Sequence, residues 1–206
     1  MTSAGNQQER LVTIGWITGF VEGEGCFSIG FVRQPDRGNR RGCKTGYQVS
    51  HEFAVTQGAR SVKALAELLK FFGVGQILIN TRHDNHKEDL FRYVVRRRKD
   101  LLQVIIPFFR QYPMRAAKQG DFEKFANCVA MMSRDEHKTR EGLAHIAEIT
   151  QTMNRGKSRQ ELIRILRDYT PDIPEEVRDE EIVPSAWRHA GWKESPLSEV
   201  VKCDAG

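Results

Sequence analysis

Two carboxylates follow an apolar segment near the start of the chain. In the stretch Trp16–Phe27, Glu22 and Glu24 are each followed by a glycine, and most of the preceding residues are apolar. Carboxylate oxygens suit Mg²⁺, which can activate water and stabilise a leaving oxygen when a phosphodiester is hydrolysed. The pattern therefore indicates a metal-assisted hydrolytic site. The alternative is a helix end closed by glycine, with two solvated glutamates.

Two glycines in the same stretch suggest how a second carboxylate reaches the first. Gly19 and Gly23 are four residues apart, so on a helix they share one face and let another backbone approach closely. Two such helices packed across a two-fold axis would place two copies of Glu24 side by side. Clustered carboxylates repel one another unless cations lie between them. Because no segment recurs along the chain, the second copy must come from a second chain, which predicts a homodimer.

The segment Ile17–Gly25 resembles the nine-residue motif of the LAGLIDADG homing endonuclease family. Glu24 stands where that family has its catalytic, metal-binding acid, usually aspartate, and Thr18 replaces the usual small alanine. The resemblance implies that Glu24 and Gly23 are the metal ligands. It also implies that Glu22 faces away from the metals.

Later tracts extend the resemblance over roughly residues 11 to 153. They are Phe53–Gln57, the turn Gly73–Gly75, Ile106–Phe109 and Tyr112–Phe122. The resemblance implies that Gln57 is positioned at the cleavage site and that Lys118 reaches the solvent network of the active site, so both join Glu24 as catalytic residues. A lysine there could stabilise developing negative charge. The alternatives are that Gln57 only ends a strand and that Lys118 is an ordinary exposed lysine.

The function implied by the resemblance is site-specific cleavage of double-stranded DNA within a long, roughly palindromic site. Mg²⁺ is the expected cofactor; Mn²⁺ is expected to substitute for it, and Ca²⁺ to support binding without cleavage. No small-molecule cofactor is expected. The dimer interface is predicted at Trp16, Gly19, Phe20 and Gly23. The alternative function is a nucleic-acid-binding protein of the same fold that does not cleave, either an intron maturase or a transcriptional regulator.

The elements that must position these residues follow from hydrophobic periodicity. Apolar spacing predicts a helix over Leu11–Val21, with Trp16, Ile17, Phe20 and Val21 on its buried side. Further predicted elements are strands over Phe27–Phe31 and Gln48–Val55, a helix over Arg60–Phe72 ended by Gly73–Gly75, strands over Gln76–Thr81 and Leu90–Arg97, and a helix over Asp100–Phe109. This αββαββα order predicts an α+β fold with an antiparallel sheet. Additional helices are predicted near Phe122–Met132, Leu143–Met153 and Arg159–Arg167.

One face of the predicted sheet carries amides, hydroxyls and charged groups, which suit the reading of base edges in a DNA groove. The expected DNA-binding residues on the strands are Ser28, Gln34, Gln48, Ser50, Glu52, Gln76, Asn80, Arg92 and Arg96. At the tip of a long basic hairpin, Arg37, Arg40, Arg41 and Lys44 are expected to contact phosphates or outer bases. The run Arg96–Lys99 is expected to hold backbone phosphates. The alternative is a solvated, charged sheet face.

Charge is unevenly distributed in the 206-residue chain, whose net charge is +5. Residues 171–206 hold nine acidic and four basic side chains, which leaves 28 basic and 18 acidic ones in residues 1–170. A basic part with an acidic tail fits a protein that binds a polyanion. We therefore predict one endonuclease domain over residues 1–170, followed by an extended or loosely packed tail that is acidic and contains proline. The alternative for the tail is local docking through Trp187 and Trp192.

Cellular context follows from what the sequence lacks. The four cysteines have no C-x-x-C spacing, which argues against a zinc cluster and a disulfide framework. No apolar run approaches the roughly 18 residues needed to cross a bilayer. The N-terminus lacks the layout of a secretory signal. We expect a protein that has no membrane partner and stays inside the cell, in a bacterial cytoplasm or an organelle.

Overall fold

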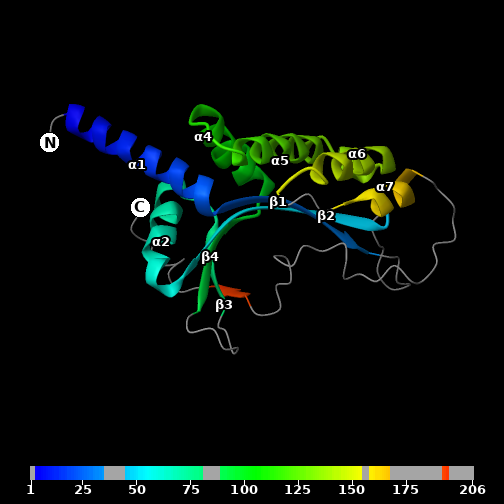
Figure 1. Ribbon diagram of the computed structural model, residues 1–206, viewed down its shortest axis with the longest axis horizontal. Coiled ribbons are helices and arrows are strands. Elements are labelled where there is room, and N and C mark those ends of the chain that lie inside the picture. Colours follow the sequence, from blue (N-terminus) through cyan, green and yellow to red (C-terminus); the bar gives the residue numbers. More distant parts are fainter. Residues whose placement is uncertain (1–2, 35–44, 81–88, 155–157, 168–191, 195–206) are drawn as a thin grey trace. The chain divides into compact units, whose positions relative to one another are not determined.

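A computed structural model describes residues 3–34, 45–80, 89–154, 158–167 and 192–194 (Figure 1). Its first elements are α1 (Ser3–Glu24), β1 (Gly25–Arg33), β2 (Tyr47–Gly58), η1 (Ala59–Ser61), α2 (Val62–Phe72), β3 (Gln76–Asn80) and β4 (Leu90–Val95). A continuous helical stretch follows: α3 (Arg98–Asp100), the π-helical segment η2 (Leu101–Ile105) and α4 (Ile106–Gln111). The last elements are α5 (Lys118–Ser133), η3 (Glu136–Lys138), α6 (Arg140–Thr150), α7 (Gln160–Arg167) and β5 (Trp192–Glu194). The predicted αββαββα order and the three additional helices are confirmed.

Helix α1 is longer than predicted, and its buried side includes Ile17 and Val21 as predicted but not Trp16. Its first residues are polar, so apolar periodicity marked only the C-terminal part. Ile14, Ile17 and Val21 are buried, with at most 6% of each residue exposed. Trp16 is 40% exposed, so the prediction that it lies on the buried side is wrong for the single chain. Phe20 is half-buried, and its ring stacks on Trp16 with centroids 5.3 Å apart.

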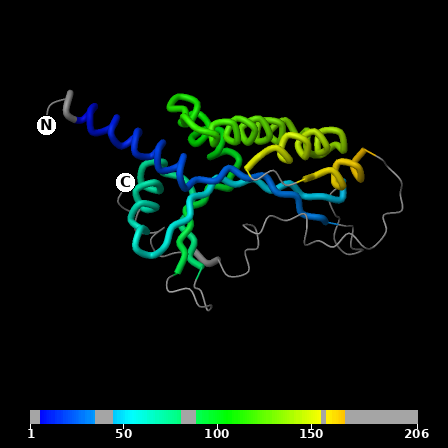
Figure 2. Tube along the Cα trace, in the orientation of Figure 1, coloured from blue at the N-terminus to red at the C-terminus, as the bar shows by residue number. Residues whose placement is uncertain are grey.

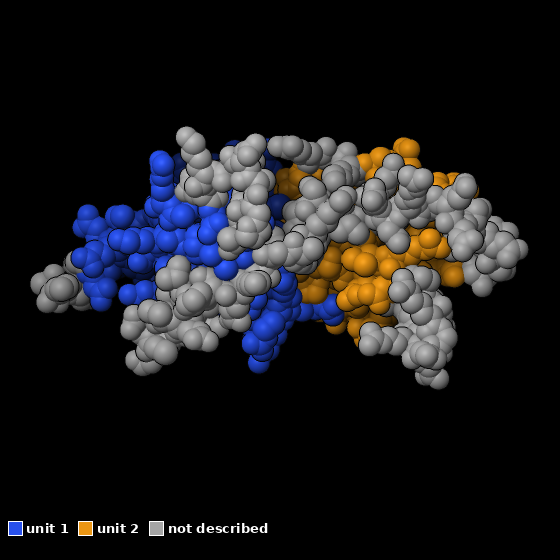
Figure 3. All heavy atoms as spheres, turned by 90° about the horizontal axis from the view of Figure 1, so that it is seen from below, with its two compact units in different colours: residues 1–26, 52–119, 191–206 blue, residues 27–51, 120–190 orange. Residues whose placement is uncertain are grey.

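The strands form one sheet in the order β1-β2-β4-β3-β5, and the paired strands whose register is defined run antiparallel. The chain divides into two compact units, which Figure 3 colours separately. Unit 1 comprises residues 1–26, 52–119 and 191–206, and unit 2 comprises residues 27–51 and 120–190. The β1–β2 hairpin, visible as adjacent strands in Figure 2, belongs mostly to unit 2, whereas the second half of β2 pairs with β4 in unit 1.

Register and alternation separate the two faces of the sheet in unit 1. Phe53 of β2 and Tyr93 of β4 are fully buried and meet edge to face, 6.1 Å between ring centroids. On the same side, Phe72 of α2 and Phe109 of α4 complete an aromatic core around Phe53. The opposite face carries a separate apolar cluster of Ala54, Leu78 and Val94. Residues opposite one another in register share a face, so side chains beside this cluster belong to the predicted DNA-reading side.

The predicted end of the second helix is confirmed at the glycine turn. Gly73 caps α2 with φ of 65°, in the left-handed region that glycine enters without steric cost, and its N–H donates to the carbonyl of Leu69 at 2.9 Å. Gly75 has φ of 90°, and a Cβ there would lie 2.5 Å from the carbonyl oxygen of Val94. The Tyr93 hydroxyl donates to the carbonyl of Val74 at 2.8 Å, which fixes the turn against β4.

Unit 2 has its own aromatic core. Phe27 of β1 packs on Phe122 and Phe125 of α5, with ring centroids 5.2 and 5.5 Å away. Asn154 ties the segment after α6 to this core, because its side-chain amide donates to the Phe27 carbonyl at 3.0 Å and its backbone N–H donates to Asp121. The guanidinium of Arg159 lies over the ring of Phe31, 5.2 Å from its centroid.

Several predictions concern residues outside the described parts of the chain. They are the hairpin tip and Trp187 with most of the acidic tail. The tail does supply β5, which sequence reasoning did not predict: Trp192, Lys193 and Glu194 pair with β3 opposite Asn80, Ile79 and Leu78. The predicted boundary at residue 170 stays a prediction. Within the described parts, no helix is long and apolar enough to cross a membrane.

Candidate active site

Glu24 is the last residue of α1, and the chain passes from it directly into β1. The residue at this junction, Gly25, is buried, and an added Cβ would lie 2.6 Å from both Cγ1 and the carbonyl oxygen of Val21. Glycine is therefore required for the helix to turn into the strand. The Glu24 carboxylate is exposed, and no partner for it is found among the described residues.

Lys118 is brought next to this acid. It is the first residue of α5, is half-buried, and donates from Nζ to the carbonyl oxygen of Gly25. An ammonium group thus lies against the backbone directly after Glu24, although the two residues are 94 positions apart in the sequence. Gln57 lies near the end of β2, opposite Phe91 and half-buried. No hydrogen bond joins it to Glu24 or Lys118 in the described parts of the chain.

Glu22 has a structural role that sequence reasoning missed. One of its carboxylate oxygens accepts hydrogen bonds from the backbone N–H groups of Arg115, at 2.8 Å, and of Ala116. This carboxylate therefore fixes the turn that leads into α5, and with it the position of Lys118. The expectation that Glu22 does not belong with the metal ligands agrees with this geometry. Only the spacing Glu-x-Glu was visible in the sequence, and it does not reveal a partner so distant along the chain.

The predicted interface glycines lie on an uncovered face of α1. A Cβ added at Gly19 or Gly23, or at Gly15 one turn earlier, would have no atom of the described residues within 4 Å. Leu11, Val12 and Trp16 on the same helix are 57%, 67% and 40% exposed. The Thr18 hydroxyl donates to the carbonyl of Ile14 at 2.9 Å, so this departure from the usual alanine is satisfied within the helix.

The donors at the end of α1 suit a hard divalent cation but do not by themselves complete a site. Mg²⁺ prefers six oxygen ligands. Glu24 offers carboxylate oxygens, and the carbonyl of Gly23 is among the last four of the helix, which have no helical partners. In the described residues, no group of three or more His, Cys, Asp and Glu side chains could hold a metal ion. The residues therefore fit Mg²⁺ only if a second carboxylate joins Glu24 from beyond the described residues or from a second chain.

The predicted DNA-binding residues fall into three groups. Gln34 and Gln48 are exposed and joined by a hydrogen bond of 2.6 Å between their side-chain amides, and Ser50, Gln76, Asn80 and Arg96 are half-buried. Ser28, Glu52 and Arg92 are buried, and the expectation that they contact DNA stays a prediction. Arg37, Arg40, Arg41 and Lys44 lie outside the described residues.

Glu52 and Arg92 belong to a charge cluster that joins β2 to β4. Their pairing allows these charged side chains to be buried. The carboxylate of Glu52 pairs with Nη2 of Arg92 through one oxygen and with Nε of Arg96, at 2.6 Å, through the other. The sequence placed all three on one sheet face but did not pair them. The signal available was an acid on one predicted strand and two arginines, four residues apart, on another.

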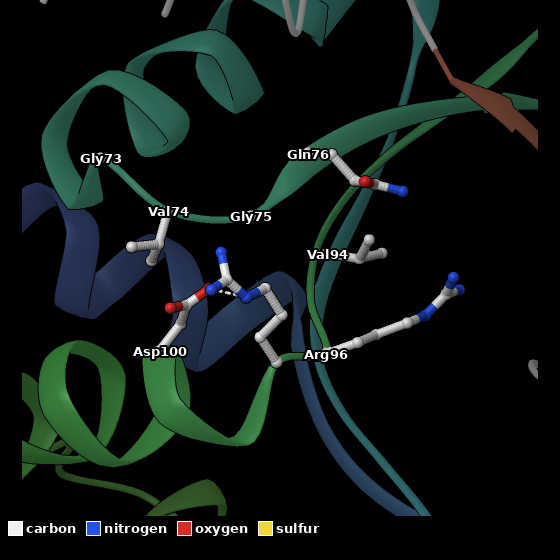
Figure 4. Close-up of a pocket in the computed structure, with 8 residues that line it drawn as sticks. Gly73, Val74, Gly75, Gln76, Val94, Arg96 and Asp100 are labelled. Carbon is white, nitrogen blue, oxygen red and sulfur yellow. Dashed lines mark ion pairs between the residues drawn. The ribbon is translucent and has the colours of Figure 1, made fainter.

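The two glycines after α2 line a pocket beside this cluster (Figure 4). Its other lining residues are Val74, Gln76, Val94, Arg96, Arg97 and Asp100. In Figure 4, Gln76, Val94 and Arg96 extend to one side of the ribbon, and Asp100 lies on the other. Asp100 forms an ion pair of 3.7 Å with Arg97, whose side chain is 78% exposed.

The structure combines an antiparallel sheet with a first helix that ends in a carboxylate, and its fold is that of solved homing endonucleases. Residues 17–129 match the family model described as LAGLIDADG endonuclease, and the chain belongs to this family.

Named relatives and solved structures agree with this assignment. The chain is 30% identical over 138 residues to the probable intron-encoded endonuclease 2 of Neurospora crassa, covering 67% of this chain and 26% of that protein. It is 28% identical over 133 residues to the DNA endonuclease I-CeuI of Chlamydomonas moewusii, covering 63% and 56%. The chain thus spans only part of the length of these relatives.

Among solved structures, the homing endonuclease I-TnaI superposes with a TM-score of 0.60 and 39% identity, over 75% of this chain and 96% of that one. The LAGLIDADG homing endonuclease I-LtrWI, solved bound to target DNA, gives a TM-score of 0.61 and 30% identity, over 69% and 44%. The predicted family and fold are confirmed.

Proposed function

We propose that the chain is a site-specific, Mg²⁺-dependent DNA endonuclease that cuts both strands as a homodimer. The observation that carries this proposal is the exposed Glu24 carboxylate at the end of α1, adjacent to the position where Lys118 is anchored. An acid that suits a hard metal and a cation that suits developing negative charge are the groups needed beside a phosphodiester. The relatives named as endonucleases support the same chemistry.

The second carboxylate is proposed to come from a second copy of α1. The uncovered glycines at positions 15, 19 and 23 allow two helices to approach closely, and the exposed Leu11, Val12 and Trp16 supply apolar surface on the same helix. A two-fold axis between the helices would bring the two Glu24 side chains together. The dimer would then recognise two half-sites in opposite orientation, which is why a roughly palindromic target is expected.

Each group at the site has a proposed role. Bound Mg²⁺ would supply Lewis acidity to the scissile phosphate and lower the pKa of a water molecule. Glu24 and the Gly23 carbonyl would hold it, Lys118 would stabilise negative charge that develops on the phosphate, and Gln57 would orient the phosphate or a water beside it. Mn²⁺ is proposed to replace Mg²⁺, and Ca²⁺ to support binding without cleavage.

The DNA would lie on the sheet face opposite the aromatic core. A two-stranded ribbon can enter the major groove, where each base pair presents a distinct set of donors and acceptors. Gln34 and Gln48 in unit 2, and Gln76, Asn80 and Arg96 in unit 1, are the accessible or half-accessible polar side chains proposed to read bases.

The test is cleavage of a plasmid library carrying randomised duplex inserts, with Mg²⁺, Ca²⁺ or no divalent ion. We expect the wild type with Mg²⁺ to linearise a narrow set of sequences related by approximate two-fold symmetry. Glu24→Gln should cut none of them and should still bind them in Ca²⁺. Binding of a defined sequence by a wild type that cuts nothing under any ion would instead support a non-cleaving DNA- or RNA-binding protein.

A further inference from the structure

Glu52 is a completely buried carboxylate in the middle of a strand, and it holds two arginines. None of its surface is exposed, and its two oxygens pair with Arg92 and with Nε of Arg96 on the neighbouring strand. The side chain of Arg92 is 5% exposed, whereas that of Arg96 is 36% exposed. Of the two guanidiniums held by this carboxylate, Arg96 is therefore the one that a ligand can reach.

The cluster lies on the sheet face proposed to meet DNA. Ala54 is opposite Val94 and Thr56 is opposite Arg92, which assigns the even-numbered residues of β2 and β4 to one face. Phe53 and Tyr93 belong to the aromatic core on the other face. Gln76 is opposite Val94 on the far side of β4, and in Figure 4 its amide extends to the same side as Arg96.

Burial makes this arrangement costly unless it is fully paired. Desolvating an ion pair usually offsets most of its Coulombic gain, and apolar side chains of similar volume often stabilise a protein equally well. What the pair does provide is geometry. A guanidinium whose Nε is fixed by a carboxylate has a defined plane, and arginine recognises guanine through two parallel donors in that plane.

We infer that Glu52 is a positioning residue for sequence recognition: it orients the guanidinium of Arg96 toward a guanine edge and does not itself contact DNA. The inference rests on the proposed function and goes beyond it, because it assigns specificity to a buried acid. Negative charge on a DNA-binding face opposes binding in general, so an acid buried there serves recognition through the arginine that it fixes.

Two roles of Glu52, a purely electrostatic one and the positioning of Arg96, predict different results for Glu52→Gln. Loss of one negative charge alone would strengthen binding to all sequences and steepen its salt dependence. Loss of positioning would reduce discrimination at the base pair read by Arg96, by about 5- to 150-fold, the range of one bidentate contact. Arg96→Ala should reduce discrimination at the same base pair. Glu52→Gln combined with Arg96→Ala should reduce this discrimination no further.

The experiment compares binding profiles of wild type, Glu52→Gln, Arg96→Ala and the double variant on a randomised duplex library in Ca²⁺. The matched control is Glu67→Gln, because Glu67 is an exposed acid on α2 in the same unit. Thermal unfolding of each variant is measured in parallel. We expect the profile of Glu52→Gln to change at the Arg96 base pair and to match wild type elsewhere, and that of Glu67→Gln to match wild type throughout.

An unchanged profile for a folded Glu52→Gln variant would overturn the inference, and so would a uniform loss of preference at all positions. If Glu52→Gln does not fold, Glu52→Met with Arg92→Met replaces the buried pair by apolar side chains and removes the carboxylate that pairs with Nε of Arg96. A folded double-Met variant that still reads its base pair like wild type would likewise overturn it. A wild type with no sequence preference would refute the proposed function itself, a result distinct from a failure at Glu52 alone.

Discussion

The ammonium of Lys118 donates to the carbonyl of Gly25, the residue directly after Glu24. Two features of the chain fix the position of Lys118 relative to Gly25. Glu22 holds the turn at Arg115 and Ala116 through their backbone N–H groups, and α5 begins two residues later with Lys118. The two acids of the motif thus differ: Glu22 positions the lysine, whereas Glu24 is proposed to bind the metal.

Replacement of Lys118 by methionine should impair cleavage more than binding. The substitution keeps the length of the side chain and removes the charge proposed to stabilise the phosphate in the transition state. We expect kcat to fall by about 10²- to 10³-fold, as for loss of one donor to a developing oxyanion. Single-turnover cleavage and equilibrium binding in Ca²⁺ measure the two effects separately. Lys70→Met, at an exposed position of α2, is the control and should cut like wild type.

Substitutions of Glu22 and of Glu24 should differ in their effects on stability and on activity. Glu22→Ala leaves two backbone N–H groups of the Arg115–Ala116 turn without their acceptor, and should lower the free energy of unfolding by about 1–2 kcal/mol. Glu24→Gln should leave unfolding within about 0.5 kcal/mol of wild type, because the side chain is exposed. Urea denaturation measures both. Equal destabilisation by the two substitutions would contradict the roles assigned here.

Stability should decline at alkaline pH because of a buried thiol. Burial raises the pKa of Cys128 from 9.0 to about 12. Since the folded pKa lies above the unfolded one, the contribution to stability is complete below pH 9 and is lost as the pH rises toward 12. The loss should approach about 1.4 kcal/mol per pH unit within this window.

Denaturant unfolding at pH 8 and pH 10.5 checks this window for wild type and Cys128→Ala. The substitution should lower stability at pH 8 through the cavity it creates, and should make the decline between the two pH values smaller. Burial also raises the pKa of Tyr93, so part of the decline should persist. The half-buried Cys26 gives a control, and Cys26→Ala should retain the wild-type decline. Identical pH dependence in wild type and Cys128→Ala would refute the prediction.

The order of the elements was predictable because each helix and strand has a pattern of apolar residues within its own segment of the sequence. Strand alternation in Gln48–Val55, helical spacing before Phe72 and the glycines after it depend only on near neighbours in sequence. Strand β5 was missed because Trp192–Glu194 is too short and too polar to show alternation, and its pairing with β3 is made across more than 100 residues.

The site was predictable in its residue types but not in its contacts. Glu24, Gln57 and Lys118 were identified through a motif and its neighbouring tracts. The partners of Glu22 and the burial of Glu52 depend on segments brought together by folding, at sequence separations of 93 for Arg115 and 40 for Arg92. Exposure of Trp16 was mispredicted for a related reason: an apolar residue on a helix can face the core of its own chain or a second chain, and periodicity does not distinguish them.

Gly19 provides a test of the dimer in which folding and assembly respond in opposite directions. A Cβ at this position meets no atom within 4 Å in the described parts of the chain. Gly19→Leu should therefore leave the single chain folded and raise its helix propensity, by up to about 1 kcal/mol. Between two closely packed α1 helices the same side chain would force the backbones apart. Sedimentation equilibrium should show dimer for wild type and monomer for the variant, with cleavage lost at concentrations where wild type is active.

Gly120→Leu is the matched control, because Gly120 on α5 also has open space around an added Cβ and lies outside α1. It should remain dimeric and active. Circular dichroism must show the same helical content in both variants, so that a loss of dimer reflects the surface of α1 and not unfolding. A dimeric, active Gly19→Leu variant would mean that the two chains meet through another surface, and the second carboxylate would then have to be sought elsewhere than at the partner's α1.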